Sequence, residues 1–228
     1  MPKKERTWVV RPRPGPHKKF ECIPLLILVR DILKLVDTGK DARKIIKAKE
    51  ILIDGKPRRD HKYPVGLFDV IEIPKLKKQY RVIPTHVGLD LVEIPKNEAK
   101  LKLCRINEKT MVKGRLLQLN LHDGKNIITE KKPTKKKAKE GVYNTGDSVL
   151  IEVPTQKMIK HIKMEKGMLV IIVGGQNMGE LIKIKEVIKT RSREPNKVIC
   201  EKKGKEFEAI KDYVFVIGKA KPLIKVIK

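Results

Sequence analysis

The sequence predicts an α+β chain of several domains in which β-strands predominate. The chain has 228 residues, which is enough for two or three small domains rather than one large core. Helical periodicity is confined to the first third, whereas from residue 75 onward short apolar runs are separated by turn residues. Hydrophobic residues make up 40% of the chain, so it can bury cores in spite of its charge.

The excess of basic residues indicates that the protein binds a polyanion. Lys and Arg number 54 and Asp and Glu number 27, which gives a formal net charge of +27. Such a surplus repels itself unless a polyanion neutralises it, and nucleic acid is the usual polyanion. An acidic membrane surface is the competing partner, but the longest apolar runs, 23–29 and 168–173, are too short to span a bilayer. We also find no secretory-type stretch near Met1, so we expect a cytoplasmic protein that binds nucleic acid.

Residues 1–20 are predicted to form an extended basic arm. Pro12, Pro14 and Pro16 exclude a helix because each fixes φ and removes a backbone donor. Trp8 can stack on a base or a sugar. We expect the arm to become ordered on RNA; the alternative is a mobile tail whose Trp8 folds back on the body. The RNA-contacting residues predicted in the arm are Arg6, Trp8, Arg11, Arg13, Lys18 and Lys19.

Residues 21–74 are predicted to form a small α/β module. Pro24 suits a first helical turn, and the apolar spacing predicts a packing helix over 24–36. Thr38 can cap a second helix, and Asp41 stands three residues on, as in a capping box. Further predictions for this module are a strand over 51–53, a tight turn at Asp54 and Gly55, and a closing strand over 69–73.

The second helix of this module has two contrasting faces. Ala42, Ile45 and Ile46 share one face, and cations lie on the opposite one. The helix and the turn that follows it are expected to present cations together to a phosphate backbone. The predicted contacts are Lys40, Arg43, Lys44, Lys47, Lys56, Arg58 and Arg59. The alternative is an ordinary amphipathic helix and hairpin whose basic side is only solvated.

This order of cap, helix, turn and closing strand resembles the S-four type of RNA-binding domain. The resemblance rests on Thr38, Asp41-Ala42-Arg43, Ile46, Ile51-Leu52-Ile53, Asp54-Gly55-Lys56, Asp60, Tyr63, Val65-Gly66 and Asp69-Val70-Ile71. It implies that this part of the chain binds RNA.

Residues 75–162 are predicted to form a central β domain. Short apolar or alternating runs predict strands over 80–83, 89–94, 117–122, 126–128 and 148–153. A charged run over 130–140 contains only Ala138 as a core-type residue, so we expect an exposed loop. Its Lys135, Lys136 and Lys137 are predicted to lie against phosphates; the alternative is a solvated loop.

Residues 163–218 are predicted to form a small SH3-like barrel, followed by a basic tail over 219–228. A buried strand over 168–173 leads into glycines, which permit positive φ and close backbone approach, and an apolar strand follows at 181–184. Neither GK[ST] nor a helix follows, which argues against a phosphate loop. The hairpin over 198–210 and the strand over 213–217 would complete the barrel.

This glycine-containing stretch resembles the KOW motif, found in ribosomal proteins and transcription elongation factors. Gly167, Gly175 and Gly179 fit that motif, but Ile182 stands where another glycine is common. The resemblance implies that the loop contacts RNA or protein, and Gln176 and Asn177 are its candidate contacts. Together with Gly55 in the earlier turn, the three matching glycines are the predicted structural glycines.

Catalysis and cofactors are not expected. Cys22, Cys104 and Cys200 lie far apart with no CxxC pair, and none of the five histidines has a partner three or four residues away, so we predict no metal site. Asp90, Asp123 and Asp147 fit turns and strands better than a catalytic group. The sequence contains no GxGxxG and no Cys/His pair. We therefore expect neither an enzyme nor a small-molecule substrate.

The order of arm, S-four module, central β domain and KOW barrel resembles the small-subunit ribosomal protein family S-four-e of archaea and eukaryotes. The start, Trp8–Lys19 followed by Cys22–Leu25, resembles that family as well. The resemblance implies a structural constituent of the small ribosomal subunit that binds small-subunit rRNA and lies beside other ribosomal proteins. Heavy use of Lys and Ile indicates an archaeal member. The alternatives are a KOW transcription or translation factor and an RNA-modifying enzyme with an appended S-four module.

Overall fold

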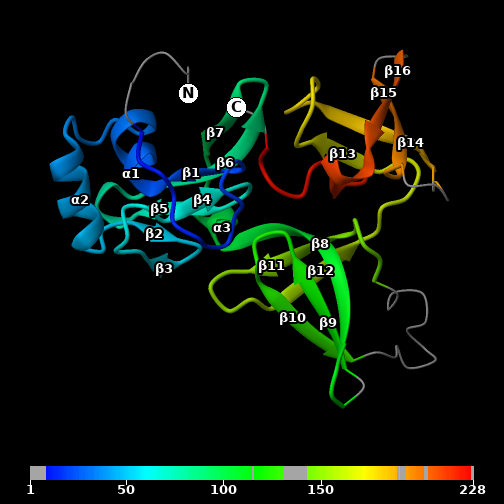
Figure 1. Ribbon diagram of the computed structural model, residues 1–228, viewed down its shortest axis with the longest axis horizontal. Helices are drawn as coiled ribbons and strands as arrows, with labels where there is room; N and C mark the ends of the chain where they lie inside the picture. The colour runs from blue at the N-terminus through cyan, green and yellow to red at the C-terminus, as the bar shows by residue number, and fades with distance from the viewer. Residues whose placement is uncertain are drawn as a thin grey trace. The chain divides into compact units, whose positions relative to one another are not determined.

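In a computed structural model, the chain forms two compact units. The structure describes residues 9–114, 116–130, 143–188, 190, 194–202 and 205–226. Unit 1 comprises 1–102, 152–155 and 225–228, and unit 2 comprises 103–151 and 156–224. Strands dominate both units, as predicted (Figure 1). No helix within the described residues is long and apolar enough to cross a membrane.

Unit 1 begins with a short strand and two short helical turns. The strand β1 (Cys22–Pro24) leads into α1 (Leu25–Ile27) and a π-helical turn over Leu28–Ile32. The sequence predicted one helix over 24–36, but the helical segment ends earlier. Lys34 has a φ of +49°, and a left-handed residue cannot continue a right-handed helix.

The second predicted helix is confirmed as α2 (Gly39–Lys47) with Thr38 as its N-cap. The Asp41 backbone N–H donates to Thr38 Oγ1 at 3.2 Å, and the Thr38 hydroxyl donates to the Asp41 carboxylate at 2.6 Å. This reciprocal cap satisfies a backbone donor that the first helical turn would otherwise leave open. Ala42 and Ile46 are fully buried, so the apolar face packs against the core of unit 1.

A five-stranded antiparallel sheet forms the rest of unit 1. Its order is β3-β2-β5-β6-β7, and β4 pairs separately with β1. The bounds are β2 (Leu52–Ile53), β3 (Lys56–Pro57), β4 (Pro64–Gly66), β5 (Val70–Ile73), β6 (Lys78–Thr85) and β7 (Gly88–Glu93). Asp54 and Gly55 have φ values of +51° and +70°, which confirms the predicted tight turn between β2 and β3.

This sheet continues across the boundary that the sequence predicted between residues 74 and 75. A 3₁₀ turn (Pro74–Leu76) returns β6 to pair with β5, and β7 then pairs with β6. The hairpin hydrogen bonds therefore place the first two strands of the predicted central domain in unit 1. A short helix, α3 (Lys96–Ala99), follows them.

Unit 2 contains two five-stranded sheets. The first has the order β10-β9-β8-β11-β12 and the second β16-β15-β14-β13-β17. The bounds in the first are β8 (Leu101–Val112), β9 (Leu116–Leu121), β10 (Asn126–Glu130), β11 (Ser148–Glu152) and β12 (Met158–Ile162). The sequence did not predict β8 or β12. The outer half of β8, from 107 on, is exposed, so it lacks the apolar alternation that marks a half-buried strand.

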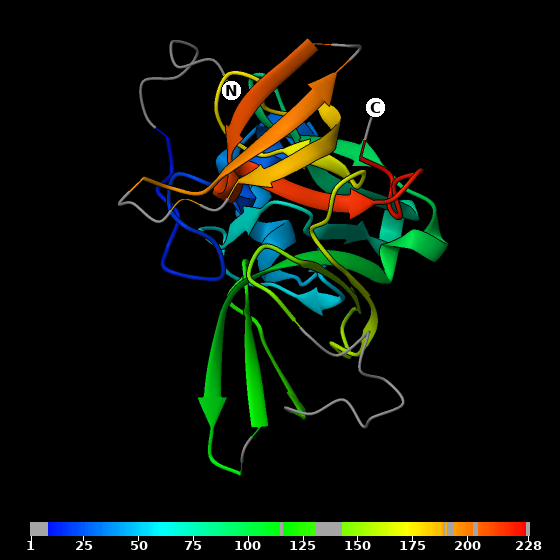
Figure 2. The same ribbon diagram turned by 90° about the vertical axis from the view of Figure 1, so that its right-hand side faces the viewer.

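The second sheet of unit 2 contains the predicted strands of the last third of the chain. They are β13 (Leu169–Ile172), β14 (Leu181–Ile188), β15 (Lys197–Lys202), β16 (Lys205–Ile210) and β17 (Val214–Gly218). Figure 2 shows them from yellow to red. Buried Val170, Ile182, Val198 and Val216 lie on neighbouring strands of this sheet.

Candidate nucleic-acid interface

Helix α2 presents a row of cations on its solvent side. Lys40, Arg43, Lys44 and Lys47 are all exposed, opposite the buried face of the helix. Lys44 Nζ lies 3.3 Å from the Asp41 carboxylate, one turn back, and this pair is exposed enough to be weak. The face can therefore offer most of its charge to an external polyanion.

The turn after β2 contributes two exposed cations, Lys56 and Arg59. The third predicted contact, Arg58, is half-buried: its guanidinium lies 4.4 Å from the Tyr63 ring centre, in a cation–π arrangement. Burial, opposed by the Arg58 charge, raises the pKa of Tyr63 to about 12. Arg58 thus packs on the body of unit 1, a role that sequence reasoning did not assign to it.

The described part of the arm, from residue 9, is anchored to unit 1. Arg13 donates its backbone N–H to the Lys62 carbonyl at 3.0 Å, and His17 Nε2 lies 2.9 Å from the Asp69 carboxylate. The His17 side chain is only 4% exposed, and a Cβ on Gly66 would come within 2.3 Å of its ring. Backbone pairing and a buried histidine therefore hold this segment against unit 1, and the ordering of the arm on RNA stays a prediction.

The exposed residues of the anchored arm include one that the sequence analysis missed. Arg11, Lys18 and Lys19 are exposed as predicted, and the exposed Arg13 guanidinium lies 3.4 Å from Asp60. Phe20 is 93% exposed, and Lys19 Nζ lies 5.4 Å from its ring centre. Its position directly after Lys18 and Lys19 is the signal in the sequence by which Phe20 could have been chosen as a candidate RNA contact.

Five predicted contacts fall outside the described residues. They are Arg6, Trp8, Lys135, Lys136 and Lys137.

The glycine loop between β13 and β14 has the backbone that its sequence predicts. Gly175 and Gly179 have φ values of +85° and +86°, and Gly167, before β13, has +80°. Gln176 is exposed and Asn177 is half-buried, with the Asn177 carbonyl accepting from the Glu180 N–H at 3.3 Å. The backbone of this loop turns tightly and leaves the Gln176 side chain open to a partner.

A buried ionic network supports the arm and the β2–β3 turn. Lys102 Nζ lies 2.7 Å from Asp54 Oδ2 and also bonds the Asp69 carboxylate, and the Lys102 side chain is 1% exposed. Burial would raise the pKa of Asp69, but the Lys102 ammonium and His17 outweigh it and hold that pKa well below its ordinary range. The network joins residues 17, 54, 69 and 102, which no local pattern in the sequence relates.

One group of possible metal ligands lies within the described residues. The ligand atoms of Cys104, His122 and Asp123 lie within 4.8 Å of one another. The Asp123 carboxylate is paired with Lys125 at 3.1 Å, and His122 Nδ1 accepts from the Arg105 N–H at 3.3 Å. The Asp123 carboxylate and His122 Nδ1 therefore already have protein partners, as buried polar groups usually do.

Comparisons with known proteins identify the family. Residues 76–158 match the family described as Ribosomal family S4e. A protein of Archaeoglobus fulgidus, named small ribosomal subunit protein eS4, is 48% identical over 229 residues, which cover 98% of this chain and 92% of that protein. This chain belongs to ribosomal protein family S4e. The family resemblance that the sequence predicted is thereby confirmed.

Other members of family S4e agree over nearly the whole chain. The small ribosomal subunit protein eS4 of Staphylothermus marinus is 46% identical, over 98% of this chain and 89% of that protein. The crystal structure of the 30S ribosomal protein S4e from Thermoplasma acidophilum matches with a TM-score of 0.71 and 31% identity, over 88% of this chain and 96% of that one. The similarity therefore extends across both units.

Proposed function

We propose that this chain is a structural constituent of the small ribosomal subunit that binds small-subunit rRNA mainly through Lys and Arg contacts to phosphates. The observation that carries the proposal is the exposed cation face of α2, on a protein of family S4e with a net charge of +27. Many dispersed cations give affinity through summed phosphate contacts, while RNA shape supplies specificity. The partners are then rRNA and neighbouring ribosomal proteins on a cytoplasmic ribosome, with no catalysis.

Each segment of the chain has its own part in the proposed RNA binding. An S-four-like module within residues 21–74 presents α2 and the β2–β3 turn, and it shares its sheet with β6 and β7. A central β segment up to residue 162 follows, and the barrel of residues 163–218 carries a KOW-like loop at 174–179. The arm and the basic tail, 219–228, add further cations.

Charge removal on α2 tests the proposal. Arg43→Gln with Lys47→Gln should weaken binding to deproteinised small-subunit rRNA. If each residue contacts one phosphate, the slope of log affinity against log salt should fall by roughly 1.4 to 1.8. Lys78→Gln with Lys96→Gln removes two exposed cations of unit 1 outside α2 and serves as the matched control. Equal losses in the two double variants would show a general charge effect and would remove α2 from the interface.

The second candidate function is that of a KOW transcription factor, because the glycine loop between β13 and β14 resembles the KOW motif. Such a factor should bind RNA polymerase when purified. A ribosomal protein should instead co-sediment with the small subunit through moderate salt. Crosslinking in native extract distinguishes the two candidates. For a ribosomal protein, α2 and Gly175–Gly179 should crosslink to rRNA; for a transcription factor, they should crosslink to nascent transcripts.

A further inference from the structure

Unit 2 contains a hollow of about 680 Å³ beside β12. Its walls come from β12, from the segment that leads into β13, and from the stretch that follows β17. All of these segments belong to unit 2. The volume lies within the range of small-molecule pockets, so the hollow is large enough for a ligand and not merely a packing gap.

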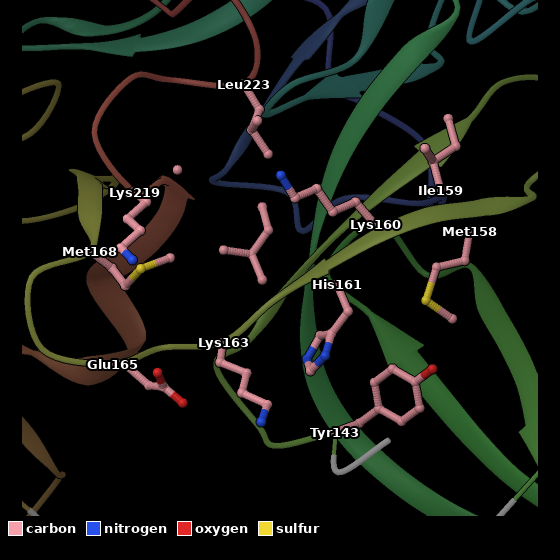
Figure 3. Close-up of a pocket in the computed structure, with 12 residues that line it drawn as sticks. Tyr143, Met158, Ile159, Lys160, His161, Lys163, Glu165, Met168, Lys219 and Leu223 are labelled. Carbon is pink, nitrogen blue, oxygen red and sulfur yellow. The ribbon is translucent and has the colours of Figure 1, made fainter. Parts of the chain in front are cut away.

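One wall of the hollow is aromatic and held in place. The Tyr143 and His161 rings lie with their centres 4.8 Å apart and tilted by 56° (Figure 3). His161 Nε2 lies 2.8 Å from Oδ2 of Asp147, and Asp147 is buried. Asp147 also accepts the backbone N–H of Asn144 and that of Met164, both at 2.9 Å. These bonds fix the His161 ring before any ligand arrives.

The rim of the hollow is cationic. Figure 3 shows Lys219 beside Met168 on one side and Lys163 on the side of His161, while Lys160 extends from β12 toward Leu223. The charged lining residues are three lysines and Glu165, so their net charge is 3 − 1 = +2. Met158, Met168 and Leu223 add apolar surface between the charges.

An aromatic and apolar wall beneath cations matches the chemistry of a nucleotide whose base is unpaired. Sequence-tolerant recognition of single-stranded RNA uses aromatic rings that stack on bases and lysines that meet the phosphate. A paired base could not leave its helix to enter the hollow without losing its partner. An acidic peptide would satisfy the lysines but would leave the aromatic wall without a planar partner.

We propose that this pocket receives one unpaired nucleotide of small-subunit rRNA, with the base against Tyr143 and the phosphate among Lys160, Lys163 and Lys219. The inference rests on the proposed rRNA binding and adds a site at which a single nucleotide is held. It assigns to unit 2 a contact of a different kind from the phosphate contacts of α2. A base stacked on a ring neutralises no phosphate, so this contact adds nothing to the counterion release that sets the salt slope.

The test is equilibrium binding of the full chain to deproteinised small-subunit rRNA across a salt series. Tyr143→Ala should lower the affinity about 5- to 150-fold, as expected for the loss of one base stack, and should leave the salt slope unchanged. Tyr143→Phe retains the ring and should bind like the parent. Lys160→Gln with Lys219→Gln should instead lower the slope by roughly 0.7 to 1.8, for one or two phosphate contacts. Lys183→Gln, an exposed lysine on β14, is the matched control.

Photocrosslinking of the same complex supplies a readout that does not depend on variant folding. The peptide that contains Tyr143 or Lys160 should crosslink to a nucleotide that chemical probing of the free RNA shows to be unpaired. Wild-type affinity of Tyr143→Ala, or crosslinks from this peptide only to duplex, would overturn the inference while leaving the α2 contacts standing. Saturable binding of free AMP or UMP that rRNA does not displace would make a mononucleotide the occupant instead. Failure of the parent chain to bind rRNA would overturn the proposed function, and this inference with it.

Discussion

The Lys102 side chain is buried between the carboxylates of Asp54 and Asp69. A buried charge is costly unless it is paired and hydrogen-bonded, and here both carboxylates have further partners. Asp54 also accepts the Val70 N–H at 3.1 Å, and Asp69 accepts the Gly66 N–H at 2.9 Å. One side chain therefore keeps two backbone turns and the arm together.

We predict that Lys102→Met destabilises the protein by about 3 to 5 kcal/mol, because two carboxylates would remain buried without their cation. Denaturant unfolding followed by circular dichroism measures this change in the free energy of unfolding. Lys100→Met, at an exposed position two residues earlier, should change it by no more than about 0.5 kcal/mol. A loss below about 1 kcal/mol in Lys102→Met would contradict the importance of the network.

Asp69 also predicts a pH dependence. Its folded-state pKa lies below the ordinary value of 3.8, so the unfolded chain binds more protons as acid is added. The contribution of Asp69 to stability is therefore complete above the unfolded-state pKa and is lost as the pH falls through the folded-state pKa. Unfolding measured from about pH 5 down to about pH 1 should show this loss. In Asp69→Asn the acid-induced loss should be smaller, although the starting stability is lower.

At the scale of elements, α2 shows how a nine-residue helix can be stable enough to carry a cation face. Helices of this length are marginal alone, so the cap and the buried face must hold it. Thr38 and Asp41 supply the cap, and Ala42 and Ile46 supply the packing. The exposed cations contribute little to that stability and are left for a partner.

Thr38→Ala should cost about 1 kcal/mol of unfolding free energy, because an N–H of the first turn loses its acceptor. Hydrogen exchange should then speed up at the amides of residues 40–42, ahead of the rest of α2. Thr38→Ser keeps the hydroxyl and should retain most of the protection. Equal exchange in the Ala and Ser variants would show that the cap does not hold the helix start.

At the scale of the whole molecule, the chain returns to unit 1 twice. Pro154 approaches Gly55, where an added Cβ would lie 3.2 Å from its ring, so the first return packs on the β2–β3 turn. The second return places the Lys225 N–H 2.9 Å from the Glu98 carboxylate and the Lys225 carbonyl 3.3 Å from buried Arg81. Residues near the C-terminus therefore complete a site formed by β6 and α3.

Deleting residues 225–228 should destabilise unit 1 by about 1 to 3 kcal/mol, since Arg81 loses one acceptor and Glu98 loses one donor. Hydrogen exchange in β6 and α3 should rise in the truncated chain. Lys225→Ala keeps the backbone bonds and loses only the bond from Nζ to the Glu93 carbonyl, so it should resemble the parent. Unchanged protection in the truncated chain would show that the last residues do not stabilise unit 1.

The sequence by itself determined the features that arise from neighbouring residues. The α2 start, its two faces, the turn at Asp54 and Gly55, the positive-φ glycines and most strands follow from capping, periodicity and turn chemistry. The net charge and the family resemblance likewise indicated an RNA-binding ribosomal protein.

Only the tertiary structure decided which distant groups meet. In the sequence Lys102 does not differ from the many other lysines, and no local pattern relates it to Asp54 and Asp69. The same holds for the sheet that crosses residue 75, for Arg58 over Tyr63, and for the lysines around the hollow beside β12. Burial and ion pairing depend on neighbours in space, and hairpin pairing joins strands whatever domain their composition suggests. Contacts of this kind appear only when the chain is folded.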